Sequence, residues 1–68
     1  MLGKIDSYEK NKGFGYIKSN YGEMVFLHIT GIIQGDPKTI EIGQEVQFVI
    51  AAGVKGPQAA KVKLSNFE

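Results

Sequence analysis

The sequence predicts an all-β protein, built as a closed or nearly closed barrel of five short antiparallel strands. Five short segments alternate apolar and polar residues, and no segment carries the 3.6-residue apolar period of a helix of ordinary length. The nine glycines suit the sharp coiling that closure of so small a barrel requires. A small all-β domain must also manage the edges of its sheet, and closure removes those edges.

The first three strands are expected to form an antiparallel meander. Leu2 and Ile5 are the predicted core anchors of the first strand. The turn that follows contains Asn11 and Gly13, residue types that tolerate a positive φ where others do not. The predicted strands are residues 3–9, 14–19 and 24–29, joined by turns at residues 10–13 and 20–22.

The second half of the chain is expected to supply two more strands after a long loop. Residues 30–43 contain three glycines and Pro37 and alternate poorly, so they are predicted as a loop with room for one short helical turn after Thr30. The remaining predicted elements are strands at residues 44–51 and 58–64 and a turn at residues 53–57. The predicted inward residues of these strands are Val46, Phe48, Ile50, Ala60, Val62 and Leu64, while Lys61 and Lys63 point outward.

Length and composition restrict the chain to one small binding domain, expected to span residues 1–68. A chain of 68 residues buries only about 60% of its unfolded surface, which leaves no room for a deep enzyme pocket. No cysteine is present, so disulfides and thiolate sites are excluded, and the cytoplasm is the expected location. No apolar run is long enough to cross a bilayer, and no nucleophile–base pair or metal-ligand cluster stands out. We therefore expect no enzyme activity, cofactor, metal ion, small-molecule substrate or membrane partner.

The second and third strands place flat rings together on one outward face, because alternate side chains of a strand share a face. Phe14, Tyr16 and Lys18 share one face of the second strand. Phe26 and His28 share one face of the third, since Val25, Leu27 and Ile29 claim the core side. Stacked bases need aromatic platforms, and the phosphates between them need nearby cations. This face is therefore predicted to bind single-stranded nucleic acid.

The distribution of lysines favours the same face. The net charge is only +1, but four of the eight lysines, at positions 4, 10, 12 and 18, fall in the first third of the chain. Lys12 and Lys18 flank the rings, so these two are predicted to contact phosphates. The chain has no arginine and lacks the bidentate groups that read guanine edges, so little sequence specificity is expected.

Several ordered sequence blocks resemble the bacterial cold-shock domain family over nearly the whole chain. The blocks are Gly3-Lys4-Ile5, Lys12-Gly13-Phe14-Gly15-Tyr16-Ile17, Val25-Phe26-Leu27-His28, Gly43-Gln44-Glu45-Val46-Gln47-Phe48 and Gly56-Pro57-Gln58-Ala59-Ala60. The resemblance implies a five-stranded OB-fold barrel that binds single-stranded RNA or DNA, with RNA favoured, in the manner of an RNA chaperone. It also implies nucleic-acid contacts by a set of side chains, namely base stacking at Phe14, Tyr16, Phe26 and His28, with Tyr8 and Lys12 as further participants.

The chain departs from the family pattern at positions that bear on binding. Asp6, Ser7 and Tyr8 stand where the family usually has a lysine, a tryptophan and a phenylalanine. Ile29 replaces a second aromatic residue after the histidine, and the loop at residues 35–39 is shorter and lacks a phenylalanine. Each missing stacking partner removes about 1–3 kcal/mol of binding free energy, so binding is expected to be weaker than with a complete set.

Other interpretations stay open at this point. A protein-interaction or regulatory module that has kept the barrel is favoured by Asp6, Ser7 and the absence of arginine. An RNA-recognition motif domain is rejected, because it needs two helices and an aromatic residue where Ser19 stands. Tyr8 is either half-buried at the edge of the barrel or a ligand contact, and His28 either stacks on a base or hydrogen-bonds across the strand pair. A monomer is expected, with a strand-swapped dimer or a module of a longer chain as alternatives.

Overall fold

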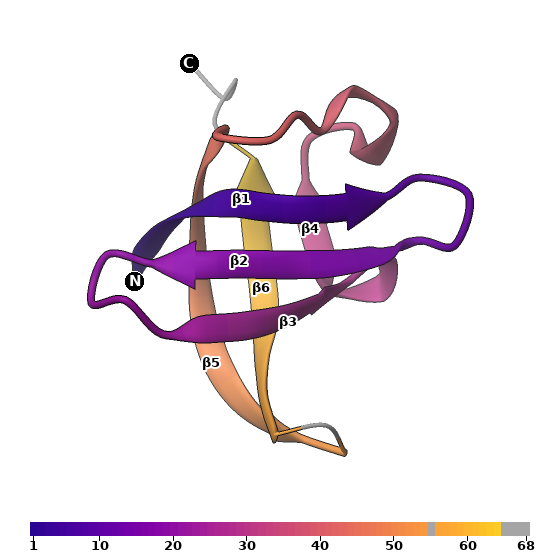
Figure 1. Cartoon of the computed structure of the whole chain (residues 1–68). Coiled ribbons are helices and arrows are strands. Elements are labelled where there is room, and N and C mark those ends of the chain that lie inside the picture. Colours follow the sequence, from indigo (N-terminus) through magenta and orange to yellow (C-terminus); the bar gives the residue numbers. More distant parts are fainter. Residues whose placement is uncertain (55, 65–68) are drawn as a thin grey trace.

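The structure is a computed structural model that describes residues 1–54 and 56–64, and it consists almost entirely of β-strands (Figure 1). Within those residues there is no α-helix; the two helical segments are single 3-10 turns, and neither could cross a membrane. The strands are β1 (Leu2–Glu9), β2 (Phe14–Ser19), β3 (Met24–His28), β4 (Ile32–Gln34), β5 (Glu45–Gly53) and β6 (Gly56–Leu64), and the turns are η1 (Ile29–Gly31) and η2 (Pro37–Thr39). Lys55 of the predicted last turn and residues 65–68 of the predicted domain lie outside the described residues.

The strands form a closed barrel of two crossing layers. β1, β2 and β3 make the expected antiparallel meander, and β5 pairs antiparallel with both β1 and β6. A parallel contact between Phe26 of β3 and Gln58 of β6 closes the barrel. In Figure 1, β1, β2 and β3 cross in front of β5 and β6, which run steeply to them. The predicted five-stranded barrel is confirmed, and its arrangement is consistent with an OB-fold.

Alternation along the strands sends every second side chain into the barrel. Ile17, Val25 and Leu27 are completely buried, as the sequence pattern predicts for the inner faces of β2 and β3. They share one cluster with Val46 and Phe48 of β5. Among the described residues, the buried apolar side chains are those of Ile5, Ile17, Val25, Leu27, Ile40, Val46, Phe48, Ala59, Val62 and Leu64. Burial of a large apolar side chain contributes about 1.5–3 kcal/mol, so this cluster is the main source of stability.

Three residues that the sequence pattern assigned to the core lie at the surface instead. Leu2 is 45% exposed, because it is three positions from the buried Ile5 and therefore points to the other face of β1. Ile29 is exposed, because β3 ends one residue earlier and the chain turns into η1. Ile50 is 38% exposed, because the β5–β6 hairpin runs beyond the barrel after Phe48 (Figure 1).

The predicted long loop contains a short strand and a second helical turn. β4 pairs in parallel with β6 through Ile32 and Val62, and Gln34 continues the contact. Three residues are too few to leave an alternating pattern in the sequence, and their partner strand lies about thirty residues further along the chain. The prediction of an irregular loop over residues 30–43 is therefore wrong in this part.

A β-bulge in β6 changes which of its alanines faces the core. Going along β5 from Gln47 to Val49 advances the pairing by two residues. The partners on β6 are Lys63 and Ala60, three residues apart, so β6 holds one extra residue there. As a result Ala59 is fully buried, whereas the expected inward residue Ala60 is only half-buried.

A second bulge, in β1, sets the outward face of that strand. Ile5 pairs with Ile17, but the next pair joins Ser7 to Tyr16, so Asp6 is the extra residue. Ser7 is thereby turned to the outer face beside Tyr16. Simple alternation from the buried Ile5 would have placed Ser7 inside.

The same bulge turns Tyr8 inward, and Gly15 makes room for it. Tyr8 pairs with Gly15, which is buried on the inner side of β2. A Cβ at Gly15 would overlap the carbonyl oxygen of Ser7 and lie 2.7 Å from the Cα of Tyr8. The absence of a side chain at this position therefore allows β1 to approach β2 closely, which positions the outer face of both strands.

Candidate nucleic-acid interface

Four rings of β2 and β3 lie in contact on the outer face of the barrel, and we call them the ring cluster. The cross-strand pairs Phe14↔His28 and Tyr16↔Phe26 set their positions. Phe26 is central, because its ring centroid lies 5.9 Å from that of Phe14 and 5.7 Å from that of Tyr16. The centroid of His28 lies 6.4 Å from that of Phe26. The structure thus brings these four predicted site residues together.

The ring cluster is open to a ligand from outside the barrel. Tyr16 is 38% exposed, and the other three rings are half-buried against one another and the sheet. The ring plane of Phe26 is inclined by 31° to that of Phe14 and by 35° to that of His28. Tyr16 meets Phe26 edge-on, at 74°. This surface offers several flat faces of the kind on which bases stack.

Two turns hold the strands of the ring cluster in register. At the far end of β2, the buried Ser19 accepts a hydrogen bond through its Oγ from the N–H group of Glu23, at 3.2 Å. At the near end, the carbonyl oxygen of Glu9 accepts bonds from the N–H groups of Lys12 and Gly13, at 3.1 and 2.8 Å. Gly13 has a φ of +74°, which suits glycine and strains other residues. The turn before β2, closed by Glu9, therefore holds Lys12 next to the start of that strand.

His28 is fixed by Thr30 and not by a bond across the strand pair, so that interpretation is wrong. The backbone N–H group of Thr30 donates to His28 Nδ1 at 3.2 Å, and Thr30 Oγ1 lies 2.9 Å from the same nitrogen. Because Nδ1 accepts the backbone proton, the neutral ring carries its own proton on Nε2. The Nε2–H group is consequently the one that can donate to a bound ligand.

Two lysines flank the ring cluster at opposite ends of β2. Lys12 lies in the exposed turn before the strand, and Lys18 is exposed near its end. Lys18 pairs with Lys4 of β1, and like charges opposite one another on a sheet repel. Lys4 has Glu45 as its other cross-strand partner, so Lys18 is the less neutralised of the two. The positive potential beside the rings is therefore available to an anion.

Tyr8 does not belong to the ring cluster. It packs against the core and lines a separate cavity of about 190 Å³, as the half-buried interpretation predicts. Lys10 and Lys38 line the same cavity, together with Ile29 and Pro37. Burial raises the pKa of the Tyr8 hydroxyl above its ordinary value of 10.0. The tyrosine therefore stays uncharged at neutral pH, with two lysines around the cavity that it lines.

Replacing Tyr8 by phenylalanine should make the protein less sensitive to alkaline pH. Because the folded pKa of Tyr8 lies above the unfolded value of about 10, the folded state holds this proton more tightly than the unfolded chain. That contribution to stability is complete below the unfolded pKa and is lost as the pH rises through the folded pKa. Urea unfolding from about pH 8 to about pH 11 measures the effect. The wild type should lose stability more steeply than Y8F above about pH 10, and equal slopes would contradict the burial of the hydroxyl.

Lys38 is the cation that the sequence alone did not assign to this region. It lies in η2, where Asp36 Oδ1 accepts a hydrogen bond from the Lys38 N–H group at 2.9 Å and Pro37 is the first residue. An aspartate followed by proline is a start signal for a helical turn, so η2 itself was detectable in the sequence. Its position beside Tyr8 depends on contacts across the barrel, which no local pattern contains.

Comparison with known proteins agrees with this geometry. The family model described as the 'Cold-shock' DNA-binding domain matches residues 1–65. The Cold shock-like protein CspD of Bacillus cereus is 52% identical over 63 residues, covering 91% of this chain and 94% of the relative. The Cold shock-like protein of Thermotoga maritima is 44% identical over 64 residues, covering 94% and 97%. The resemblance found in the sequence is confirmed, and this chain belongs to the cold-shock domain family.

Proposed function

We propose that this protein binds single-stranded nucleic acid on the ring cluster, with RNA favoured over DNA and with little sequence specificity. The observation that carries the proposal is the group of outward rings around Phe26, whose centroids lie 5.7 to 6.4 Å from its own. Every base has a flat face, so such rings bind bases regardless of sequence. Lys12 and Lys18 supply the phosphate contacts, and Tyr8 adds a contact through its cavity. The description of the matching family model as DNA-binding supports the same class of ligand.

The mechanism that follows is that of an RNA chaperone acting in the cytoplasm. Unpaired bases stack on the ring cluster, and a base held there is withdrawn from hairpin pairing. Lysine ammonium groups are flexible point charges without a fixed fork geometry, so the phosphate contacts form and break without a defined register. Weak and rapid capture therefore disfavours secondary structure in the nucleic acid without any chemical step.

A fluorescence titration of a labelled oligouridine at several salt concentrations tests this function. Contact with about three phosphates should give a slope of about −2 for the logarithm of the association constant against the logarithm of salt concentration. The matching oligodeoxyuridine, which differs only in the sugar, tests the preference for RNA. Binding that is indifferent to salt, or no binding at hundreds of micromolar protein, would contradict the proposal.

A protein-interaction or regulatory role is the second candidate, and one observation favours it. Ser7 is exposed on the outer face and pairs with Tyr16, so a small polar side chain occupies the place beside the ring cluster where the family usually has a tryptophan. Asp6, also exposed, adds a negative charge next to it. An apolar protein contact is nearly independent of salt, so the same titration distinguishes the two candidates.

Replacing Ser7 by tryptophan should tighten nucleic-acid binding. The bulge at Asp6 places position 7 on the outer face opposite Tyr16, so a ring there would extend the ring cluster onto β1. One more stacked base is worth about 1–3 kcal/mol, or about 5- to 150-fold in affinity. The oligouridine titration measures the gain, with Ser7→Leu as a control that adds apolar area without a ring. An S7W protein that binds no better than S7L would contradict stacking at this face.

A further inference from the structure

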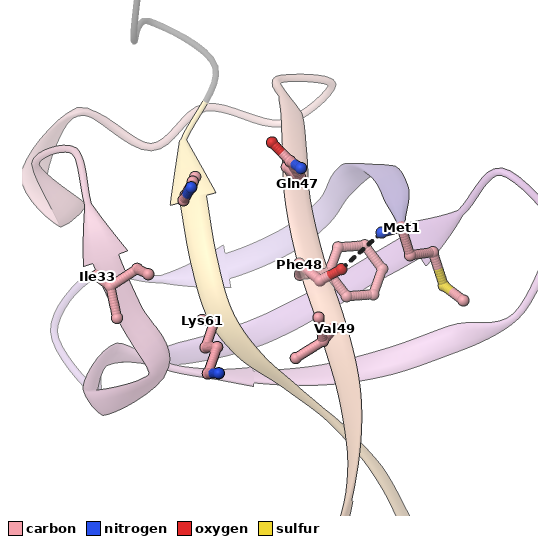
Figure 2. A pocket seen from close by; sticks show the side chains of 7 residues that line it. Met1, Ile33, Gln47, Phe48, Val49 and Lys61 are labelled. Carbon is pink, nitrogen blue, oxygen red and sulfur yellow. Dashed lines mark hydrogen bonds between the residues drawn. The ribbon is translucent and has the colours of Figure 1, made fainter.

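A second concave surface lies on the side of the barrel away from the ring cluster. It is a cavity of about 220 Å³ bordered by β5, β6 and β4 (Figure 2). Figure 2 views it from the β5–β6 layer, with β1, β2 and β3 behind. At one end, the Met1 nitrogen donates a hydrogen bond to the carbonyl oxygen of Phe48, at 2.8 Å, which ties the start of the chain to β5. The cavity is therefore separate from the surface assigned above.

Among the residues that the structure describes, the charged side chains around this cavity are all positive. Lys61 and Lys63 of β6 line it, and none of the described acidic side chains does. Both lysines are exposed, and neither forms an ion pair or a side-chain hydrogen bond within residues 1–54 and 56–64. Two unneutralised cations two residues apart attract an anion with more than one charged group.

The backbone at Lys61, which lines the cavity together with Lys63, has an uncommon conformation. Lys61 has a φ of +51° and is the one non-glycine residue with a positive φ in the described part of the chain. L side chains avoid this left-handed region, and exceptions concentrate at functional sites. The conformation coincides with the bulge in β6, and bulges redirect side chains. Lys61 and Lys63 are two residues apart, and both line the cavity.

The remaining walls are apolar and suit a flat group. The side chain of Ile33 in β4 is 60% exposed and that of Val49 in β5 is 47% exposed. Both line the same cavity as the two lysines. The amide of Gln47 adds one polar group. Small-molecule pockets usually begin at about 300 Å³, so this cavity holds no more than a single nucleotide-sized unit. Anionic groups linked to flat, partly apolar rings are the chemistry of a nucleic-acid strand.

We propose that the cavity at Lys61 and Lys63 is a second contact site for single-stranded nucleic acid, in which the two lysines hold phosphates and Ile33 and Val49 contact the attached base or sugar. This inference rests on the proposed function of the ring cluster. The phosphates come either from the far part of the strand bound there or from a second strand. In the first case one long nucleic-acid strand wraps around the barrel and contacts both sites. In the second case the protein holds two nucleic-acid strands at once.

The double variant Lys61→Asn/Lys63→Gln tests the site. Asparagine tolerates a positive φ, so the variant should keep the bulge at position 61 while losing the charge of the lysine. The oligouridines used are about six and about sixteen nucleotides long, which lie within the site sizes of about 4–16 nucleotides known for one OB-fold domain. The hexamer that binds on the ring cluster should have the same affinity for wild type and variant. For the longer strand, loss of two phosphate contacts should make the salt slope of the variant shallower than that of the wild type by about 1.4. If the two proteins bind equally at 1 M salt, the variant should therefore bind about 25-fold more weakly than the wild type at 0.1 M salt.

Matched controls and a second readout separate the alternatives. The variant Lys61→Arg/Lys63→Arg keeps both charges and should restore binding of the longer strand, and thermal unfolding checks that each variant is folded. Two hexamers with donor and acceptor dyes report a second strand. Energy transfer with two hexamers per protein, lost in the neutral variant, assigns the cavity to a second strand. One long strand per protein, weakened by the same variant, assigns it to the same strand.

Three outcomes would overturn the inference. If wild type and neutral variant bind the longer strand equally and no second hexamer binds, the second site does not exist, while the proposed function of the ring cluster stands. A wild type that binds neither oligonucleotide removes the proposed function and the second site together. An acidic peptide of alternating aspartate and phenylalanine that binds the wild type and not the neutral variant, with no difference on nucleic acid, assigns the cavity to a protein partner instead.

Discussion

Replacing Phe14 and Phe26 together by alanine should weaken oligouridine binding by at least about 30-fold. Each stacked base is worth about 1–3 kcal/mol, so loss of two rings costs at least about 2 kcal/mol. The effect should be smaller than the sum of the single substitutions, because Phe26 contacts Phe14, Tyr16 and His28 and its loss alone already weakens stacking on Phe14. The fluorescence titration used for the wild type measures the loss.

The matched control for this experiment is Tyr21→Ala. Tyr21 is also an aromatic residue, but it lies in the turn between β2 and β3, is 82% exposed and is not part of the ring cluster. Its removal should leave the affinity unchanged. Circular dichroism checks that the double variant is folded, which is expected because neither phenylalanine belongs to the buried core. A folded double variant that keeps the wild-type affinity would rule out stacking on these rings.

Replacing Phe48 by alanine should remove most of the stability of the fold. Phe48 is the largest of the fully buried side chains and lies in the same core as Ile17 and Leu27 of the opposite layer. Phenylalanine-to-alanine changes in a core cost about 3–5 kcal/mol. A chain of this length has a total stability of about 3–10 kcal/mol, so the variant should be marginally folded or unfolded at room temperature.

Urea unfolding followed by circular dichroism measures this loss, with Val49→Ala as the control. Val49 is the next residue of β5 but points outward, so its truncation should change the free energy of unfolding by no more than about 0.5 kcal/mol. A Phe48→Ala protein that loses less than about 1 kcal/mol would contradict the central place of this ring in the core.

Sequence alternation predicted the structure well where a strand has one buried and one open face. Ile17, Val25 and Leu27 are completely buried, and Phe14 and Phe26 lie on the other side, as the period of two requires. A shift of one residue in either strand would move aliphatic side chains into water and rings into the core. The hydrophobic effect therefore fixes the register of β2 and β3, and with it the ring cluster.

Prediction failed where an extra residue interrupts the alternation. The bulge at Asp6 turns Ser7 outward and Tyr8 inward, and the bulge at Lys61 exchanges the roles of two alanines. A bulge depends on the partner strand, such as the room that Gly15 leaves for β1, and it has no local sequence signal. The separate position of Tyr8 follows from the first bulge and could not be derived from the period of two.

Prediction also failed where contacts are short or distant in sequence. β4 exists because Ile32 pairs with Val62, about thirty residues further along the chain, and closing so long a loop costs chain entropy that only the complete fold offsets. In the β5–β6 hairpin beyond Phe48, side chains still alternate between two faces, but neither face is covered by the other layer of the barrel. Ile50 is therefore exposed. The local pattern did not predict β4, and it predicted the strand conformation of the hairpin but not the exposure of Ile50. In both places tertiary contacts decide which side chains are buried.

The most direct test of nucleic-acid binding on the ring cluster is an NMR titration of the isotopically labelled protein with a short oligouridine. We expect the largest shifts of backbone and aromatic signals at Phe14, Tyr16, Phe26 and His28, with smaller shifts at Lys12 and Lys18. Signals of the buried core, such as Val25 and Leu27, should move little. Shifts confined to the β5–β6 hairpin, or no shifts at millimolar oligonucleotide, would contradict the assignment of this face.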